Sequence, residues 1–338
     1  MSKPLSENPR HLEQLCAALD IGPQIGALSG VSGGYHHRMW RLESQRGSYA
    51  VKQLSVDADV SDADTVEHYN VTETIAETFA GRGVPAVYAI KQGETYLQVI
   101  DGEGYLVYPW SAGAALDIFQ ISTGHALEIA RILARMHRAN IAVPGANQQQ
   151  FDIHGEEKIV QLLELSWEFN RKVAKSLQDA LPNVLSVVER QRSATQSLQC
   201  HQVISHGDLD QKNVLWDTKG NPALIDWESA RELNPTYEIV LEALNWSGIG
   251  SRFDPQLFWK LISSYRNAGG IIERDSLEAS FHCVLGDWVN WLMYNVGRSF
   301  DPEDEAQRTL GAQQVDLALS TLRRLSKELP ELVSRERL

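Results

Sequence analysis

The amino-acid sequence predicts a bilobal α+β fold, in which a small antiparallel sheet with one helix precedes a larger, mostly helical part. Residues 1–108 contain short β-favouring runs separated by turns, several of them rich in glycine. Residues 109–338 mostly carry apolar residues at helical spacing, and a single polar hairpin interrupts them. A chain of 338 residues has room for both parts and a substantial core.

Composition narrows the classes of partner. The 31 basic and 44 acidic residues give a net charge of −13, and no basic cluster indicates nucleic acid or an anionic membrane as a partner. Acidity can steer a cationic small molecule toward the protein, and it equally keeps a protein in solution. The sequence has no signal-like apolar segment and no membrane-spanning run, and Cys16, Cys200 and Cys283 form no metal or disulfide pattern. We therefore expect a cytoplasmic protein.

The β-rich part begins with a helix after Asn8-Pro9, followed by strand candidates around a glycine-rich turn, residues 29–34. Glycines in such a turn let backbone N–H groups approach phosphate oxygens. The same residues also match G-x-S-x-G, the nucleophile elbow of α/β-hydrolases, with Ser32 as the nucleophile. That motif requires a helix directly after it. Residues 35–44, YHHRMWRLES, instead favour a strand, which argues against a hydrolase.

Further elements of this part follow in order. A strand is expected over residues 48–54, a helix over 62–82, and three strands over 86–90, 95–100 and 105–108. In the helical part, residues 151–181 and 184–198 are expected to form separate helices, with Pro182 between them.

The most informative stretch is residues 203–231. A β-rich run breaks at Ser205-His206-Gly207-Asp208, and two short apolar runs joined by turn residues then read as a β-hairpin. Asp208 precedes the hairpin, Asn213 starts its first strand, and Asp226 ends its second. Two carboxylates and a carboxamide oxygen suit Mg²⁺, which takes its remaining ligands from water and phosphate. A carboxylate not used by the metal can serve as a base.

This order of residues resembles a known family. An aspartate, an asparagine five positions later and a hairpin leading to a second aspartate form the arrangement of protein kinases. His206-Gly207-Asp208, where protein kinases carry His-Arg-Asp, and Ile225-Asp226-Trp227-Glu228, in place of Asp-Phe-Gly, resemble the aminoglycoside phosphotransferase family. That family includes choline, homoserine and other small-molecule kinases.

The resemblance implies a protein-kinase-like fold, with a nucleotide-binding lobe over residues 1–108 and a helical lobe over 109–338. It implies ATP and Mg²⁺ as cofactors, a monomer or homodimer, and a role for each matching residue. Asp208 would be the base, Asn213 and Asp226 would hold Mg²⁺, and Lys52 would orient the phosphates. Glu73, preferred over Glu77, would hold Lys52 in place. Phosphate binding would involve Ser32 and Gly33, and backbone groups at Val107 and Trp110 would bind the adenine edge.

The acceptor is expected to be a small molecule with a hydroxyl group, such as an aminoglycoside or another amino-bearing alcohol. Choline, homoserine and sugars fit the same motif, and a nucleotide-binding pseudokinase with a regulatory role is a further alternative. Asp287, Trp291 and Tyr294 are nominated for acceptor specificity, although aromatic residues at helical spacing also serve as core.

Overall fold

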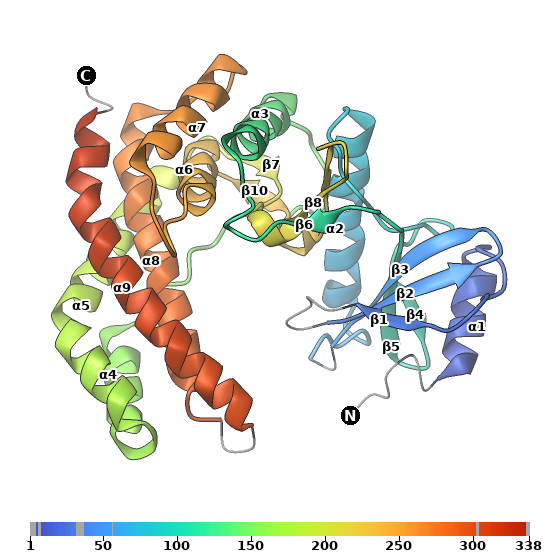
Figure 1. Cartoon of the computed structure of the whole chain (residues 1–338), viewed down its shortest axis with the longest axis horizontal. Coiled ribbons are helices and arrows are strands. Elements are labelled where there is room, and N and C mark those ends of the chain that lie inside the picture. The colour runs from blue at the N-terminus through green and yellow to red at the C-terminus, as the bar shows by residue number, and fades with distance from the viewer. Residues whose placement is uncertain (1–4, 6–7, 32–36, 56, 302–303, 336–338) are drawn as a thin grey trace. The chain divides into compact units, whose positions relative to one another are not determined.

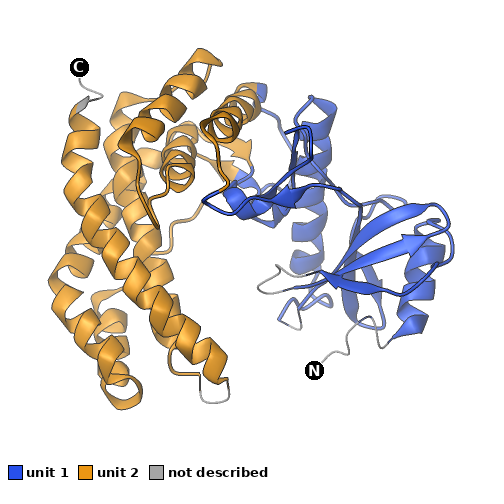
Figure 2. Ribbon diagram, in the orientation of Figure 1, with its two compact units in different colours: residues 1–119, 139–147, 206–231 blue, residues 120–138, 148–205, 232–338 orange. Residues whose placement is uncertain are grey.

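The computed structural model describes residues 5, 8–31, 37–55, 57–301 and 304–335 (Figure 1). The chain forms two compact units, each made of several segments (Figure 2). Unit 1 comprises residues 1–119, 139–147 and 206–231, and unit 2 comprises residues 120–138, 148–205 and 232–338. This division differs from the single boundary expected at residue 108, because the hairpin segment 206–231 groups with the N-terminal part of the chain.

Unit 1 contains the expected antiparallel sheet, in the order β1-β2-β3-β5-β4. Its strands are β1 (Ser29–Val31), β2 (Arg38–Ser44), β3 (Gly47–Gln53), β4 (Gln98–Ile100) and β5 (Glu103–Pro109). Lys52 of β3 lies opposite Leu106 of β5 and Met39 of β2, so both neighbouring strands fix its position.

Two helices belong to the same unit, α1 (Pro9–Ala18) and α2 (Ala63–Gly81). Leu12, Leu15 and Cys16 of α1 are buried in one apolar cluster with strand residues such as Val51 and Val107. Helix α2 begins where the Asp62 side chain accepts a hydrogen bond from the Asp64 N–H. Such a cap satisfies a backbone donor that the first helical turn leaves free.

The predicted strand over residues 86–90 is wrong, because this segment bonds to two different elements. The Val87 N–H donates to the Leu224 carbonyl (2.8 Å), and the Leu224 N–H donates to the Pro85 carbonyl (2.8 Å). Further along, the Ile90 N–H donates to the Val107 carbonyl (2.7 Å). These bonds join the polar hairpin directly to the segment after α2, which explains why the hairpin belongs to unit 1.

The hairpin itself consists of β8 (Val214–Trp216) and β9 (Pro222–Leu224), with β6 (Ala114–Ala115) paired to β8. Short 3₁₀ turns, η2 (Gln211–Asn213) and η3 (Trp227–Ser229), lie before and after it. The predicted hairpin is therefore present.

Unit 2 is mostly helical. Its elements are α3 (Thr123–Ala139), α4 (Glu156–Phe169), α5 (Arg171–Leu198), α6 (Pro235–Trp246), α7 (Pro255–Asn267), α8 (Arg274–Arg298) and α9 (Glu305–Arg335), with two short paired strands, β7 (Val203–Ser205) and β10 (Arg231–Leu233). Helix α8 packs along α5 and α9 (Figure 1). No helix in the described part of the chain is long and apolar enough to span a membrane.

The predicted helix break at Pro182 is wrong, since α5 continues through it. The break lies at Asn170 instead, whose side chain accepts a hydrogen bond from the Val173 N–H (3.2 Å) and starts α5. Asparagine is a strong N-cap residue, so it sets the helix boundary here.

Candidate functional site

The residues predicted for catalysis, metal binding and the lysine site lie in unit 1. Lys52, Glu73, Asp208, Asn213 and Asp226 all belong to it. Ser32 and Gly33 lie outside the described residues. The geometry of the site can therefore be described within a single compact unit.

Asp208 and Asn213 are in direct contact. The Asn213 Nδ2 group donates to the backbone carbonyl of Asp208 (2.7 Å) and to its Oδ2 atom (2.9 Å). The Lys212 Nζ atom lies 3.1 Å from the same Oδ2 atom. The amide nitrogen of Asn213 is therefore the atom that faces Asp208, and its amide oxygen is the atom that the predicted metal-ligand role would use.

Glycine is required at position 207 on steric grounds. Gly207 has a positive φ of 77°, and a Cβ atom there would lie 2.3 Å from the Ser229 carbonyl oxygen and 2.6 Å from Nη1 of Arg231. The Arg231 guanidinium donates to the same Ser229 carbonyl (2.6 Å). The arginine that protein kinases carry at this position is thus excluded here, and a guanidinium from later in the chain lies beside Gly207.

His206 supports the hairpin. Its Nε2 atom lies 3.1 Å from the Ile225 carbonyl oxygen, so the ring donates to the backbone just before Asp226. Its ring centroid also lies 4.5 Å from that of Trp227, and His206 itself is buried. Through these contacts His206 braces the loop that carries Asp208 against the end of the hairpin.

Asp226 lies at the end of β9 in a left-handed backbone conformation, with φ of 63°. Aspartate and asparagine tolerate this region better than most residues with a side chain. The preceding residue, Ile225, donates its N–H to the Asn213 carbonyl (3.0 Å). This backbone bond ties the residue before Asp226 to Asn213, and it therefore couples the positions of the two predicted metal ligands.

Lys52 is the buried cation of the site. Its Nζ atom lies 2.7 Å from Asp226 Oδ1 and 2.7 Å from Glu228 Oε2. Glu228 also accepts from His37 Nε2 (3.2 Å), whose Nδ1 accepts from the Ser55 N–H (3.0 Å). A ring nitrogen that accepts carries no proton, so His37 is the neutral Nε2–H tautomer in this arrangement. Neither Glu228 nor His37 is predicted from the sequence, in which only the position of Glu228, two residues after Asp226, gives a signal.

The charges in this cluster reinforce one another. Burial opposes the charged ammonium of Lys52, but the carboxylates of Asp226 and Glu228 outweigh it and raise the Lys52 pKa above its ordinary value. Burial likewise opposes the Glu228 carboxylate, yet the hydrogen bond from His37 and the charge of Lys52 lower the Glu228 pKa well below its usual range. Both groups are therefore charged at neutral pH.

The Glu73 carboxylate bonds to groups other than its expected partner Lys52, although the Lys52 ammonium is close enough for its charge to lower the Glu73 pKa. Its buried carboxylate accepts from the Tyr108 hydroxyl (2.7 Å) and from the Ala89 N–H (2.7 Å). Among the described residues, the ion-pair partners of Lys52 are Asp226 and Glu228. Burial raises the pKa of Glu73 to about 7, and the two hydrogen bonds only partly offset it.

This raised pKa predicts a pH-dependent stability. A carboxyl whose pKa rises on folding stabilises the fold fully below its unfolded pKa, near 4.5, and loses that contribution as the pH rises through about 7. Glu73→Gln removes the titration, so relative to the wild type it should gain roughly 2 to 3 kcal/mol of unfolding free energy between pH 5 and pH 8. Urea unfolding at several pH values measures this difference.

Glu77→Gln provides the matched control. Glu77 lies one helical turn further along α2, and its hydrogen bonds from Lys91 and Tyr96 lower its pKa below 4.5. It therefore stays ionised from pH 5 to pH 8, and its variant should keep the pH profile of the wild type. Parallel profiles for the wild type and Glu73→Gln would contradict the assignment.

The predicted hinge has most of its backbone groups bonded within the protein. The Val107 carbonyl accepts from the Ile90 N–H (2.7 Å), and the Trp110 N–H donates to the Ser48 carbonyl (3.0 Å). The Arg41 guanidinium lies 4.6 Å from the centroid of the Trp110 ring. A cavity of about 510 Å³ lies beside this segment, lined by residues that include 86–91 and 109–111.

The three residues nominated for acceptor specificity lie on α8 in unit 2. Asp287 accepts from the Tyr237 hydroxyl (2.6 Å). The Trp291 and Tyr294 rings are stacked with centroids 5.5 Å apart, and both side chains are partly exposed. Trp291 also donates to Gln314 of α9 (3.3 Å). An exposed aromatic pair offers a flat surface to a ligand, whereas Asp287 already has a partner inside unit 2.

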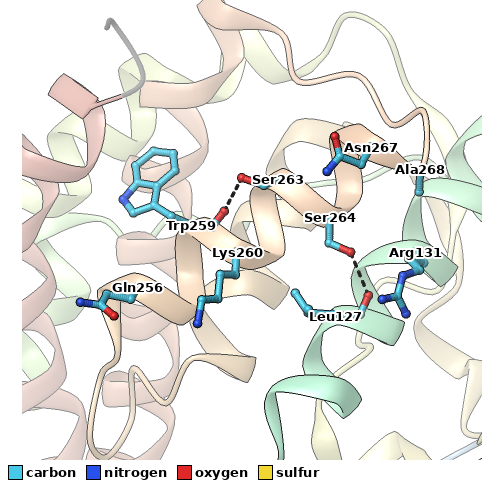
Figure 3. A pocket seen from close by; sticks show the side chains of 9 residues that line it. All are labelled: Leu127, Arg131, Gln256, Trp259, Lys260, Ser263, Ser264, Asn267 and Ala268. Carbon is cyan, nitrogen blue, oxygen red and sulfur yellow. Dashed lines mark hydrogen bonds between the residues drawn. The ribbon is translucent and has the colours of Figure 1, made fainter.

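A second cavity, of about 540 Å³, lies between α3 and α7 of unit 2 (Figure 3). The Ser264 hydroxyl donates to the Leu127 carbonyl (3.2 Å) and joins the two helices at this cavity. None of the predicted site residues lines it.

The donor set can be compared with what a metal needs. In the described part of the chain, no group of three or more His, Cys, Asp or Glu side chains is placed to hold a metal ion. Mg²⁺ that is bound together with phosphates and water needs only one or two protein oxygens. The Asp226 carboxylate and the Asn213 amide are oxygen donors of the kind that such a site would use.

The sequence model of the phosphotransferase enzyme family matches residues 27–267. No curated protein sequence matches the chain. Among solved structures, spectinomycin phosphotransferase in complex with ADP and spectinomycin is similar, with a TM-score of 0.67, 14% identity, and coverage of 93% of this chain and 98% of that chain.

Two further structures share the fold. A choline kinase from Streptococcus pneumoniae has a TM-score of 0.60 and 17% identity, over 94% of this chain and 100% of that chain. An amicoumacin kinase in complex with AMP-PNP and Ca²⁺ has a TM-score of 0.65 and 11% identity, over 93% of each chain. These similarities confirm the predicted protein-kinase-like α+β fold. The match over residues 27–267 shows that the chain belongs to the phosphotransferase enzyme family.

Proposed function

We propose that this protein transfers the γ-phosphoryl group of ATP to a hydroxyl group of a small molecule, with Asp208 as the base. The observation that supports this most strongly is a continuous set of contacts within unit 1. Asp208 contacts Asn213, the Asn213 carbonyl accepts from the residue before Asp226, and Asp226 contacts Lys52. These contacts link the proposed base, the two proposed metal ligands and the proposed phosphate-binding lysine within one compact unit.

In the proposed step, the Asp208 carboxylate accepts the proton of the acceptor hydroxyl as its oxygen attacks the γ-phosphorus. The new phosphorus–oxygen bond forms while the bond to the β-phosphate oxygen breaks, and ADP leaves. Asn213 orients Asp208 through its two hydrogen bonds. Catalysis of this type depends mainly on positioning and on neutralising charge.

The remaining residues of unit 1 would bind the nucleotide. Asn213 and Asp226 would hold Mg²⁺, which neutralises phosphate charge when it is bound. Asp226 and Glu228 hold the Lys52 ammonium, which would orient the phosphates. Ser32 and Gly33 of the glycine-rich turn would contribute to phosphate binding.

Other residues would complete the nucleotide site. The segment that contains Val107 and Trp110 would form the adenine-binding hinge. The Val107 carbonyl and the Trp110 N–H are bonded within the protein. Neighbouring backbone groups would therefore make the contacts to the adenine edge. Glu73 supports the nucleotide site through Tyr108 of the adjoining strand rather than through direct contact with Lys52.

The acceptor would be an aminoglycoside or another amino-bearing alcohol, including choline-like compounds. Structures of similar fold are named for spectinomycin and choline as substrates. The net charge of −13 favours a cationic acceptor by steering. Asp287, Trp291 and Tyr294 remain the nominated contacts in unit 2, since a cation binds well over exposed aromatic faces.

The test is the release of ADP by purified protein with ATP and Mg²⁺, against a panel of aminoglycosides, other antibiotics, choline, homoserine and sugars. Release that depends on the acceptor supports the kinase and identifies the acceptor class. Binding of ATP with no release for any acceptor would favour a pseudokinase. The absence of any nucleotide binding would overturn the proposal.

A further inference from the structure

The segment from Asp208 to Asn213 contains a cluster of charged side chains, and the proposed function gives a role to only one of them, Asp208. The Lys212 Nζ atom lies 3.1 Å from Asp208 Oδ2 and 3.3 Å from Asp210 Oδ2. The Asp210 Oδ1 atom accepts from the Lys212 N–H (2.9 Å), which fixes the backbone between them. A single ammonium thus lies between the proposed base and a second carboxylate.

Ordinary ion pairing does not account for this cluster well. Exposed ion pairs contribute only about 0 to 1 kcal/mol to stability, and the Lys212 side chain is 52% exposed. Asn213 already donates one hydrogen bond to the Asp208 carboxylate and a second to the Asp208 backbone carbonyl, so Lys212 is not needed to position this residue. Asp210 adds a negative charge beside a base that must work next to phosphate, and this charge is unfavourable unless a cation offsets it.

We propose that Lys212 is a further catalytic residue, whose ammonium binds the oxygens of the transferring phosphoryl group. This inference rests on the proposed function. The phosphoryl group must come close to the acceptor oxygen that Asp208 contacts, and an ammonium 3.1 Å from Asp208 is within reach of it. Preorganised cations at a transferring phosphoryl group stabilise the charge of the transition state.

The long side chain of Lys212 would allow its ammonium to leave the Asp208 carboxylate and bind a phosphate oxygen instead. Lysine carries a compact charge on a flexible four-carbon stem. Asp210 can retain the stem near the loop while the ammonium moves from Asp208 to a phosphate oxygen. The move frees the Asp208 Oδ2 atom to accept the proton of the hydroxyl, so one cation would both shield the base and bind the phosphoryl group.

The experiment compares the affinities of AMP-PNP and ADP in the presence of Mg²⁺, since only AMP-PNP carries a γ-phosphate. Lys212→Met should weaken AMP-PNP binding about ten- to a hundredfold more than ADP binding, because a hydrogen bond from a charged donor to that phosphate is lost. Lys212→Arg should restore most of the difference. Lys219→Met, in the exposed hairpin turn, removes the same charge and should leave both affinities unchanged.

A double variant separates direct contact from local charge. Asp210→Asn combined with Lys212→Met restores the net charge of the cluster, and the selective loss of AMP-PNP affinity should persist in it. Recovery of AMP-PNP binding in the double variant, or equal effects on both nucleotides in Lys212→Met, would overturn the inference and leave the proposed function intact. A wild type that binds neither nucleotide would instead overturn the proposed function. Thermal unfolding of each variant confirms that it folds.

Discussion

Replacement of Asp208 by alanine is expected to lower acceptor-dependent turnover by at least a hundredfold while ATP binding stays close to that of the wild type. General-base assistance typically contributes about 10²- to 10⁴-fold to the rate. The side chain accepts from Asn213 and pairs with Lys212, but both residues keep another partner when it is removed. Asn213 still donates to the Asp208 carbonyl, and Lys212 still pairs with Asp210. The fold should therefore survive the change.

The measurement is ADP release at saturating ATP, together with the ATP affinity of the same preparation. Asp179→Ala is the control, because Asp179 is an exposed residue of α5. Turnover close to that of the wild type in Asp208→Ala would show that another group is the base. A parallel loss of ATP affinity would show that Asp208 acts in nucleotide binding instead.

The second large effect is expected for Asp226→Asn, which should reduce Mg²⁺-dependent turnover by about a thousandfold or more. A metal that neutralises phosphate charge supplies several kcal/mol of transition-state stabilisation, and each 1.36 kcal/mol is tenfold in rate. Asparagine is the suitable replacement, because position 226 has a positive φ that alanine adopts only with strain. Lys52 keeps Glu228 as a partner in this variant.

The direct measurement is the stabilisation of the protein by ATP, as a shift in Tm, with and without Mg²⁺. Mg²⁺ should increase the shift for the wild type and change it little for Asp226→Asn. Asp179→Asn should behave as the wild type. A full Mg²⁺ response in Asp226→Asn would remove Asp226 from the metal site.

The hairpin and its polar residues could be predicted because their signals are local. Turn residues, short apolar runs and the spacing of Asp208, Asn213 and Asp226 all lie within a few tens of residues. The five-stranded sheet and α2 were predictable for the same reason, since each has its own turn or cap residues. Gly207 is part of the sequence motif, but the reason for a glycine there, the close approach of Ser229 and Arg231, comes only from the structure.

The partners of Lys52 could not be predicted in this way. Asp226 and Glu228 lie 174 and 176 residues away in the sequence, and they reach Lys52 only because β9 bonds to the segment after α2. Glu73 matched the expected spacing on its helix, yet its carboxylate accepts hydrogen bonds from the Tyr108 hydroxyl and the Ala89 N–H. Spacing along a helix identifies the face on which a side chain lies, but it does not show which neighbouring group that side chain will bond to. Backbone bonds at Val107 and Trp110 leave no trace in side-chain identity.

The grouping of the hairpin with the sheet has a consequence for how such a chain diversifies. Lys52, Asp208, Asn213, Asp226 and Glu228 are all held by contacts inside unit 1 (Figure 2). Under the proposed function, mutations in α8 of unit 2 would change the choice of acceptor and leave the proposed phosphate-binding residues of unit 1 in place. Recognition and chemistry would then rest on separate sets of residues, so a library around Asp287, Trp291 and Tyr294 of α8 is the place to search for new acceptors.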